Sequence, residues 1–214
     1  GEKLDLFTIS EKVGKGLPLF TPKGALLRKL LNNYFQELMA KKGWQEVWSP
    51  HITKNDLYKT SGHWDKFGDE LFLVKSQETK DELVMKPMNC PHHQQIYASK
   101  PRSYKDLPIK YMENATVYRD EKAGELLGLS RVRSITQDDS HTFCTPDQIE
   151  RIYQELIDIT KEFYLKIGMK IKARLSFRIK TDAKKYLGET KLWKKAEDIL
   201  LTIAKKNNLD YFVA

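Results

Sequence analysis

The sequence predicts an α+β fold in one domain, and three observations support this prediction. A helical segment with an amphipathic face lies between Thr21 and Gly43. Two strand-like segments flank a glycine-bearing loop between Tyr111 and Cys144. Helical and strand patterns alternate along the rest of the chain, without an internal repeat or a low-complexity segment. No stretch has the composition of a linker, so we expect one domain of 214 residues.

The first expected helix has clear start and stop signals. Thr21 is a good N-cap residue and Pro22 suits the first turn, whereas Gly43 suits the end of a helix. Between them, apolar residues recur at helical spacing. These residues are Leu27, Leu30, Leu31, Tyr34, Leu38 and Met39.

Shorter elements are expected along the middle of the chain. Residues 44–48 have the pattern of a strand, and Pro50 would stop it. Residues 71–74 and 83–86 are apolar enough for two further strands, and residues 91–99 for a helix.

The C-terminal part of the chain alternates in the same way. Thr145 to Gln148 has a capping-box pattern, and a helix should run from there to Gly168. Residues 169–177 alternate between apolar and polar, which indicates a half-buried strand. A last helix is expected over residues 192–207, followed by strand-like residues 211–213.

The second strand of the central hairpin carries an unusual row of polar side chains. Successive strand side chains point to opposite faces of a sheet, so residues at odd positions share one face. Cations for phosphate, a carboxylate for an amine and an imidazole for a metal suit a nucleotide-using active site. A solvated outer face explains the alternation almost equally well. The odd-numbered polar residues are Arg131, Arg133, Gln137, Asp139 and His141, joined by Glu113 and Arg119 of the first strand.

The composition is that of a soluble globular protein, with 40% hydrophobic and 31% charged residues. No apolar run approaches membrane-spanning length and the N-terminus lacks a signal-peptide pattern, so we expect a cytoplasmic protein without membrane contact. The two cysteines fit a reducing compartment. A net charge of +8 and a pI near 9.2 favour an anionic partner such as nucleic acid or nucleotide. The alternative explanation of the positive net charge is that the lysine-rich helices near the C-terminus are simply exposed to solvent.

Four cysteine and histidine residues could form a closed zinc site on spacing alone: Cys90, His93, His141 and Cys144. However, His141 and Cys144 have opposite parity on a regular strand and could not face one ion. The better pair is Cys90 with His141, although two protein ligands are too few for zinc. A buried inert thiol is the alternative for Cys90. We interpret His51, His92 and His93 as surface or packing residues.

Several short motifs stand in order along the whole chain. They are Pro22-Lys23-Gly24 with Leu27-Arg28, Gly43-Trp44-Gln45-Glu46-Val47 ending at Pro50, Ser61-Gly62-His63-Trp64, Lys86-Pro87-Met88-Asn89-Cys90-Pro91, and the central segment with Arg119-x-Glu121, Gly124, Gly128, Arg131-Val132-Arg133 and Thr136-Gln137-Asp138-Asp139-Ser140-His141. In these motifs the chain resembles the threonyl-tRNA synthetases, a family of class II aminoacyl-tRNA synthetases. Residues 43–50 resemble motif 1 of that class, and the central segment resembles motif 2.

The resemblance implies a fold and an extent. The fold would be a mostly antiparallel sheet flanked by helices, incomplete at its C-terminal end. Residues 1–214 would be a partial catalytic domain that contains motifs 1 and 2. Motif 3, the anticodon-binding domain and the editing domain would lie outside this sequence, so the chain alone is expected to be inactive.

The resemblance also implies an activity: the ATP-dependent ligation of L-threonine to tRNA(Thr) through threonyl-adenylate. Mg²⁺ would accompany ATP, and motif 1 would join two subunits into a homodimer. A zinc ion would bind the amino and hydroxyl groups of threonine. An apolar pocket discriminates weakly between threonine and valine, whereas a metal that requires an oxygen ligand excludes valine.

For ATP and for transfer, the resemblance implies four residues. Arg119 matches the arginine that holds the α-phosphate and the reacting carboxylate. Glu121 matches an acid near the adenine, and Arg131 a second phosphate-binding arginine. His63 matches a histidine implicated in the transfer to tRNA.

For threonine and zinc, the resemblance implies five residues. Cys90 and His141 match two of three zinc ligands. Asp139 matches a carboxylate that assists threonine recognition, and Gln137 neighbours it on the same strand face. Met88 is expected to line the substrate site.

The chain departs from the family pattern at three positions. Ile135 stands where an aromatic residue often stacks on adenine, His92 where glycine is usual, and Leu127 where histidine is common. The alternative to an enzyme is a non-catalytic synthetase-like paralogue that binds tRNA or a protein partner. Arg119, together with the implied zinc and threonine ligands, favours the enzyme.

Overall fold

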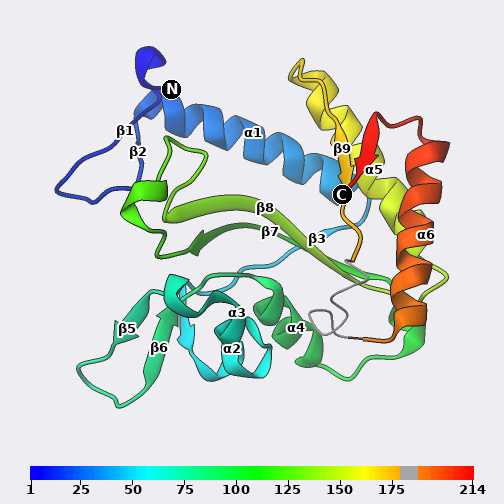
Figure 1. Ribbon diagram of the computed structural model, residues 1–214, viewed down its shortest axis with the longest axis horizontal. Coiled ribbons are helices and arrows are strands. Elements are labelled where there is room, and N and C mark those ends of the chain that lie inside the picture. The colour runs from blue at the N-terminus through cyan, green and yellow to red at the C-terminus, as the bar shows by residue number, and fades with distance from the viewer. Residues whose placement is uncertain (179–187) are drawn as a thin grey trace. The chain divides into compact units, whose positions relative to one another are not determined.

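The computed structural model describes residues 1–178 and 188–214, which form an α+β fold, as the sequence predicts (Figure 1). The contacts divide the chain into two compact units, residues 1–143 and 144–214. No linker composition marks the boundary after Phe143. Among the described residues, no helix is long and apolar enough to cross a membrane.

The first unit contains four helices and eight strands among its described elements. In chain order they are β1 (Phe7–Thr8), β2 (Leu19–Phe20), α1 (Pro22–Lys41), β3 (Gln45–Glu46), β4 (Ile52–Lys54), α2 (Asp56–Thr60), α3 (His63–Phe67), β5 (Leu73–Lys75), β6 (Glu82–Met85), α4 (Cys90–Ala98), β7 (Ile109–Tyr118) and β8 (Ser134–Phe143). Short 3₁₀ turns cover Glu2–Leu4, Gly68–Glu70, Tyr104–Asp106 and Ala123–Glu125.

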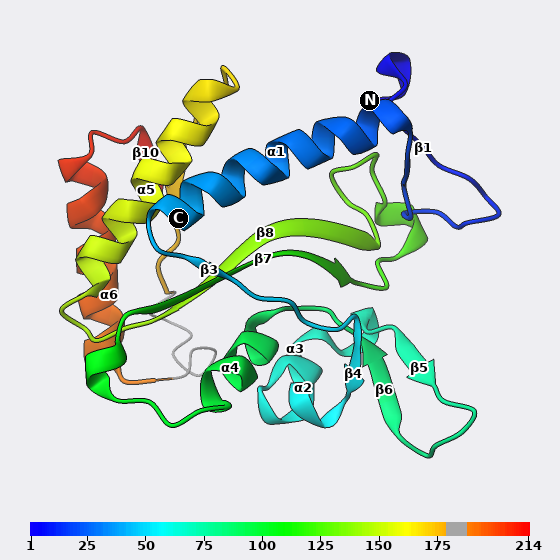
Figure 2. The ribbon, with the colours of Figure 1, turned by 180° about the vertical axis from the view of Figure 1, so that it is seen from behind.

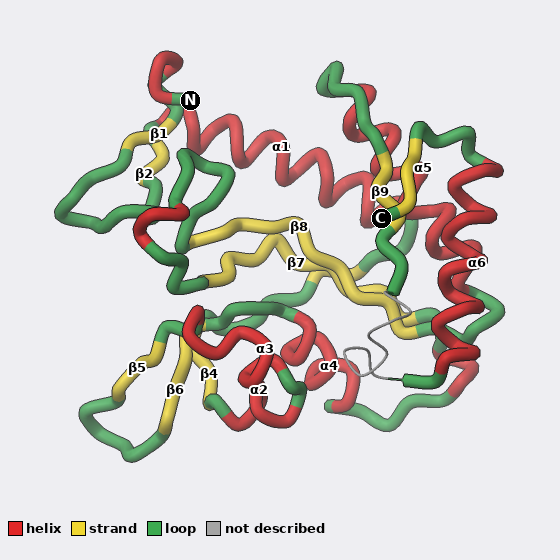
Figure 3. The backbone as a smooth tube through the Cα atoms, in the orientation of Figure 1, coloured by secondary structure: helices red, strands yellow, loops and turns green. Residues whose placement is uncertain are grey.

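The long hairpin of β7 and β8 is the centre of this unit (Figure 3). The two strands pair antiparallel, with Glu113 opposite Asp139 and Tyr111 opposite His141. Strand β3 adds a short parallel pairing on the far edge of β7. Since paired residues are both odd-numbered or both even-numbered, the register keeps Glu113, Asp139 and His141 on one face, as the alternation predicts.

The two faces of this hairpin meet different helices (Figure 2). On the even-numbered face, Asn114 accepts a hydrogen bond from Asn32 of α1 at 3.0 Å, and Thr136 accepts one from Arg28 at 2.9 Å. On the odd-numbered face, the side chain of Asn89, just before α4, donates to Asp139 at 2.9 Å. The row of polar side chains therefore faces α4 and its entry loop.

Helix α1 begins as predicted, because the hydroxyl of Thr21 accepts a hydrogen bond from the backbone N–H of Gly24 at 3.3 Å. Of the amphipathic row, Leu38 and Met39 are buried, but Leu27 and Leu30 are exposed. Polar residues at four-residue spacing point toward β3, β7 and β8 instead, since Gln36 donates to Glu46 at 2.9 Å, in line with the contacts of Arg28 and Asn32.

The strand expected over residues 44–48 is shorter than predicted, because only Gln45 and Glu46 pair with β7. Its two tryptophans do not share an environment. Trp44 is buried beneath the ammonium of Lys110, which lies 4.3 Å from the ring centroid, whereas Trp48 is 73% exposed. Trp48 follows the paired residues of β3, so the strand does not extend to it.

A second small sheet has the antiparallel order β4–β6–β5. Its strands lie close to those expected from the apolar segments 71–74 and 83–86. Val84 of β6 and Tyr58 of α2 are fully buried, so they form the core of this part of the unit.

The second unit contains α5 (Ile149–Lys166), β9 (Ala173–Leu175), α6 (Thr190–Lys206) and β10 (Tyr211–Val213). Strands β9 and β10 pair parallel, and Ile159 and Ile203 are buried on the two helices. The half-buried strand expected over residues 169–177 is reduced to three residues, whereas both helices follow the prediction closely.

Candidate active site

A buried carboxylate, Glu113 of β7, lies at the centre of the odd-numbered face. Its Oε1 accepts hydrogen bonds from the backbone N–H of Ser49 at 2.9 Å and from the hydroxyl of Ser49 at 3.0 Å. Its Oε2 lies 2.9 Å from the same hydroxyl and 3.0 Å from Nε2 of His93. The ammonium of Lys86, which is 1% exposed, lies 3.4 Å from Oε1. Four segments of the chain therefore meet at one carboxylate.

The surroundings of Glu113 determine its charge. Burial alone would raise the pKa of Glu113, but hydrogen bonds from His93 and Ser49 outweigh it and hold the pKa at about 2. Burial lowers the pKa of Lys86, and the charge of Glu113 opposes that effect. Glu113 is thus a carboxylate at neutral pH, held by hydrogen bonds from Ser49 and His93 and by the nearby ammonium of Lys86.

Acid should destabilise the first unit between about pH 4.5 and pH 2. The pKa of Glu113 is about 2 when folded and ordinarily 4.5, so the unfolded chain binds the proton first as the pH falls. The stabilisation, about 3 kcal/mol, is complete above pH 4.5 and is lost as the pH falls through 2. Urea unfolding at stepped pH should show this slope in the wild type and a smaller one in Glu113→Gln.

The exposed carboxylate of Glu82 provides a matched control for this measurement. Its pKa is also lowered, by hydrogen bonds from Asn55 and Lys59, but its side chain is 74% exposed to solvent. Glu82→Gln should therefore keep nearly the whole slope, and an equal loss in both variants would contradict the role assigned to Glu113.

The imidazole of His93 connects Glu113 to the predicted ligand His141. Nδ1 of His93 lies 2.8 Å from Nδ1 of His141, and the two rings meet edge to face at 87°. His93 is fully buried, which agrees with its interpretation as a packing residue. It also has two polar partners that the sequence did not indicate, Glu113 and His141.

Cys90, the first residue of α4, lies in the field of Asp139. Burial and the charge of Asp139 both raise the pKa of the Cys90 thiol, and the charge of Asp139 also acts on His141. Thiol and imidazole groups suit zinc, but a zinc site needs at least three protein ligands. Across residues 1–178 and 188–214, no three histidine, cysteine, aspartate or glutamate side chains meet as a metal site.

Arg119 and Met88 lie together at the end of β7. Nη2 of Arg119 lies 3.1 Å from the sulfur of Met88, and the guanidinium lies 5.2 Å from the ring centroid of Phe67. His63 stacks on the ring of Phe67, with the two ring centroids 6.0 Å apart and the rings nearly parallel. Nε of Arg119 is buried and has no hydrogen-bond partner among the described residues. This part of the site therefore presents an unsatisfied cationic donor.

Glu121 and Arg131, expected to contact different parts of ATP, bind each other. Nε and Nη2 of Arg131 lie 2.8 and 2.7 Å from one oxygen of Glu121, which is buried. Arg131 also pairs with Glu125. Arg131 and Arg133 both precede β8. They therefore lie in the loop that connects the two strands of the hairpin and not on the expected strand face.

Gln137 is placed on the odd-numbered face, opposite Ala115, and is exposed. Ile135, which lies opposite Val117 on the same face, is half-buried. Gln137 makes no side-chain hydrogen bond to any residue that the structure describes. It therefore remains available to a ligand.

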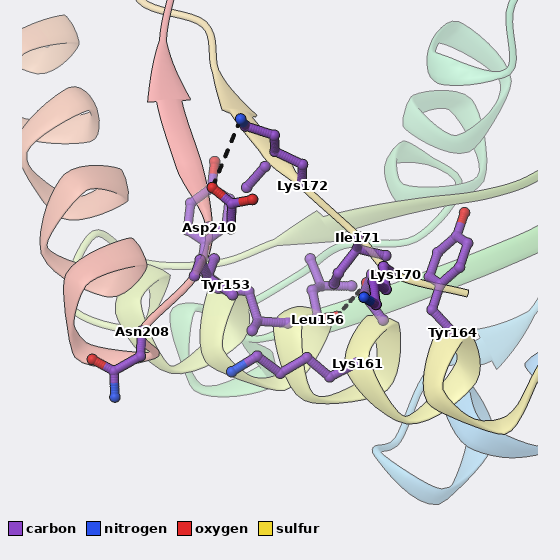
Figure 4. Close-up of a pocket in the computed structure, with 13 residues that line it drawn as sticks. Tyr153, Leu156, Lys161, Tyr164, Lys170, Ile171, Lys172, Asn208 and Asp210 are labelled. Atoms are coloured by element: carbon purple, nitrogen blue, oxygen red, sulfur yellow. Dashed lines mark hydrogen bonds and ion pairs between the residues drawn. The ribbon is translucent and has the colours of Figure 1, made fainter. Parts of the chain in front are cut away.

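The most spacious pocket among those described lies wholly in the second unit and contains none of the expected site residues (Figure 4). It has a volume of about 740 Å³. Tyr153 and Leu156 of α5 form one wall, while Ile171 and the ion pair of Lys172 with Asp210, at 3.8 Å, form another.

Sequence reasoning missed three members of the buried cluster: Ser49, Lys86 and His93. Their separation from Glu113 along the chain ranges from 20 to 64 residues. Lys86 could have been noticed in the sequence, because it follows an apolar strand. A lysine that is buried at such a position needs an anionic partner.

The family model of the tRNA synthetase class II core domain (G, H, P, S and T) matches residues 72–211. The chain belongs to this family. The match covers α4, both strands of the central hairpin and nearly all of the second unit, whereas Ser49, His63 and Phe67 of the site lie before it.

Over nearly its whole length, the chain is similar to curated threonine–tRNA ligases. It is 46% identical to that of Cytophaga hutchinsonii over 98% of this chain and 33% of the relative. It is also 46% identical to that of Flavobacterium psychrophilum, over 100% and 33%. The chain therefore spans about a third of the length of the curated relatives it matches.

A solved structure agrees with this fold. The RNA binding domain of threonyl-tRNA synthetase from Cryptosporidium parvum Iowa II superposes with a TM-score of 0.89 and 33% identity, covering 100% of this chain and 52% of that one. The fold expected from the resemblance, a class II synthetase core, is thus confirmed.

Proposed function

We propose that this chain is the part of a threonine–tRNA ligase that binds ATP and threonine and forms threonyl-adenylate. The buried, unsatisfied Nε of Arg119 carries this proposal, because a cationic donor without a partner needs an anion. A phosphate oxygen or a carboxylate fits that requirement. The similarity to threonine–tRNA ligases supports threonine as the amino acid.

In the proposed reaction, the threonine carboxylate attacks the α-phosphorus of ATP and pyrophosphate leaves. The 3′-hydroxyl of the terminal adenosine of tRNA(Thr) then takes the threonyl group. Arg119 would hold the carboxylate and the α-phosphate in line, and Arg131 a further phosphate. Mg²⁺ bound to ATP would neutralise more of the charge. Positioning and charge stabilisation of this kind supply most of the acceleration in such reactions.

On the threonine side, Asp139 would accept hydrogen bonds from the amino group, held in place by Asn89 at 2.9 Å. Met88 and Gln137 would line the same site. His63 would act in the transfer to tRNA. The ring of Phe67 contacts both the imidazole of His63 and the guanidinium of Arg119.

The test is a chimera in which this chain replaces the matching third of the Flavobacterium psychrophilum relative, to which it aligns over its full length. The chimera should exchange pyrophosphate into ATP only when threonine is present. A folded chimera that binds tRNA(Thr) but shows no threonine-dependent exchange would favour the non-catalytic paralogue.

Zinc belongs to this proposal through Cys90 and His141. Their thiolate and imidazole would supply two bonds, and a third donor would come from polypeptide outside these 214 residues. Zinc content measured by mass spectrometry on the dialysed chimera should therefore fall in Cys90→Ser. Cys144→Ser is the matched control, because its half-buried thiol is not an expected ligand. Equal zinc content in both variants would contradict the assignment.

We also propose a homodimer that uses the motif 1 region. Trp48 is 73% exposed, and the apolar side chains of Leu26, Leu27 and Leu30 on α1 are exposed too. Large exposed apolar side chains are typical of protein interfaces. Sedimentation of the chimera should give a dimer, and Trp48→Lys should shift it toward the monomer. Leu165→Lys, at an equally exposed apolar site on α5, should leave the dimer intact.

A further inference from the structure

We propose that the cavity of the second unit binds a small amphiphilic anion, which is a molecule with an apolar body and one carboxylate or sulfonate group. All the residues that line this cavity belong to the second unit, and none of them is expected in the active site. The proposal is therefore independent of the proposed function, and a chimera without ligase activity would leave it standing.

Three segments of the second unit line the cavity. Helix α5 contributes one face, because residues separated by three, four or seven positions lie on the same side of a helix. Residues 170–173, before and within β9, form another wall, and residues 208–210 connect α6 to β10 beside Tyr153 (Figure 4). The lining residues of α5 are Tyr153, Leu156, Ile157, Thr160, Lys161 and Tyr164.

The size of the cavity fits a small molecule. Its volume of about 740 Å³ lies within the range of about 300–1,000 Å³ that is typical of ligand pockets. Tyr153 and Tyr164 lie toward its two ends and are three helical turns apart on α5, roughly 16 Å (Figure 4). Residues 208–210 lie at the end beside Tyr153, where they would obstruct a bound helix. A two-ring body or a medium-length alkyl chain fits this space better than a helix.

Much of the cavity lining is apolar and is not fully covered by the protein. Leu156, Ile157 and Leu209 are half-buried, and Ile171 is 38% exposed. A ligand that covered these side chains would remove their apolar surface from water, which is favourable. We therefore infer that the body of the ligand is apolar.

The charged groups around the cavity select an anion. Lys161 donates a hydrogen bond to the backbone oxygen of Asn207 at 2.9 Å, and its ammonium has two further N–H donors. Neither Lys161 nor Lys170 has a carboxylate partner in the part of the chain that the structure describes. Asp210, the one acid among the described lining residues, pairs with Lys172 at 3.8 Å. Two ammonium groups are thus left for the anionic group of a ligand.

Small molecules of other classes match only one of these two features. Inorganic phosphate would pair with the ammonium groups but leave the apolar walls in water. An uncharged apolar molecule would cover the walls but leave the ammonium groups without an anion, and a cation would be repelled by them. An amphiphilic anion matches both the walls and the charges.

The experiment uses the dye anilinonaphthalene sulfonate, whose fluorescence rises when its aromatic rings leave water. Titration of the folded 214-residue chain near neutral pH should show saturable binding of one dye molecule per chain. Lys170→Glu should weaken this binding about fivefold or more, because it replaces an attraction by a repulsion. Ile171→Asp should weaken it about tenfold or more, because it places a charge in an apolar wall.

Each of these variants has a matched control in the second unit. Lys194→Glu makes the same change of charge at an exposed residue of α6 that does not line the cavity. Met169→Asp makes the same change as Ile171→Asp at a 58% exposed residue outside the lining. Both controls should bind the dye like the wild type.

Competition tests the chemistry of the ligand. Octanoate and naphthoate should displace the dye, and the more effective of the two shows whether the site prefers an alkyl chain or flat rings. Acetate and phosphate at the same concentration should not displace it, because they lack an apolar body.

The proposal is overturned if the dye does not bind saturably, if the lining variants bind it like their controls, or if acetate or phosphate displaces it. A dimer in sedimentation that Ile171→Asp dissociates would also overturn it, because a second copy of the chain would then cover the cavity. Circular dichroism shows which variants are folded. If one lining variant does not fold, the other variant and the competition decide.

Discussion

Replacing Arg119 with alanine should lower threonine-dependent pyrophosphate exchange by the chimera about 10²- to 10³-fold, the usual cost of losing one positioned charge-stabilising donor. The guanidinium is fixed by Met88 at 3.1 Å and by the ring of Phe67, so it is oriented before any ligand arrives. Most of the loss should fall on kcat, because the arginine is expected to bind charge that develops during the reaction.

Arg151→Ala is the matched control for this substitution. Arg151 is an exposed helix residue whose nearest carboxylate, Glu155, lies 3.8 Å away. Its removal should leave the exchange rate unchanged. An Arg119→Ala chimera that retained the wild-type rate would mean that the unsatisfied donor does not meet the reacting anion.

Replacing Lys86 with methionine should destabilise the chain by about 3–5 kcal/mol, because it leaves the buried charge of Glu113 without its cation. Lys86 and Glu113 are 3.4 Å apart, and both lie out of solvent. Methionine preserves most of the volume of the lysine side chain, so the loss reports charge rather than a cavity. Urea unfolding at pH 7 measures it through the midpoint and slope.

The exposed ion pair of Lys59 with Glu82, at 3.3 Å, offers the comparison. Pairs in solvent contribute about 0–1 kcal/mol, so Lys59→Met should change stability little. A loss below about 1 kcal/mol in Lys86→Met would show that Ser49 and His93 alone are enough to hold the carboxylate.

The parts of the fold that depend on neighbours in sequence were predictable. Helix α1 follows its capping threonine and first-turn proline, and the hairpin follows strict alternation. The parity of Asp139 and His141 followed from the same alternation. The length of β3 was not predictable, because pairing with β7 over two residues depends on a strand more than 60 residues away.

The parts that depend on distant residues were not predictable. The leucines of α1 fit an amphipathic pattern, yet Arg28 and Asn32 contact the even-numbered face of the hairpin and Gln36 contacts β3. Motif resemblance supplied Arg119, Met88 and Cys90 as separate residues. Their contacts, and the arrangement of Lys86, Glu113 and His93 behind them, arise only when four segments fold together.

The pairing of Arg131 has a consequence for which anions can bind there. Its guanidinium, 46% exposed, is already neutralised by Glu121 and Glu125. A chloride ion or a monoanionic metabolite would have to displace two carboxylates for one new contact. A polyphosphate carries enough charge to compete, and the pair with Glu125, which is exposed on both sides, is weak enough to yield. Glu121 and Glu125 would therefore compete with incoming anions for Arg131, so that highly charged anions bind there in preference to monoanions.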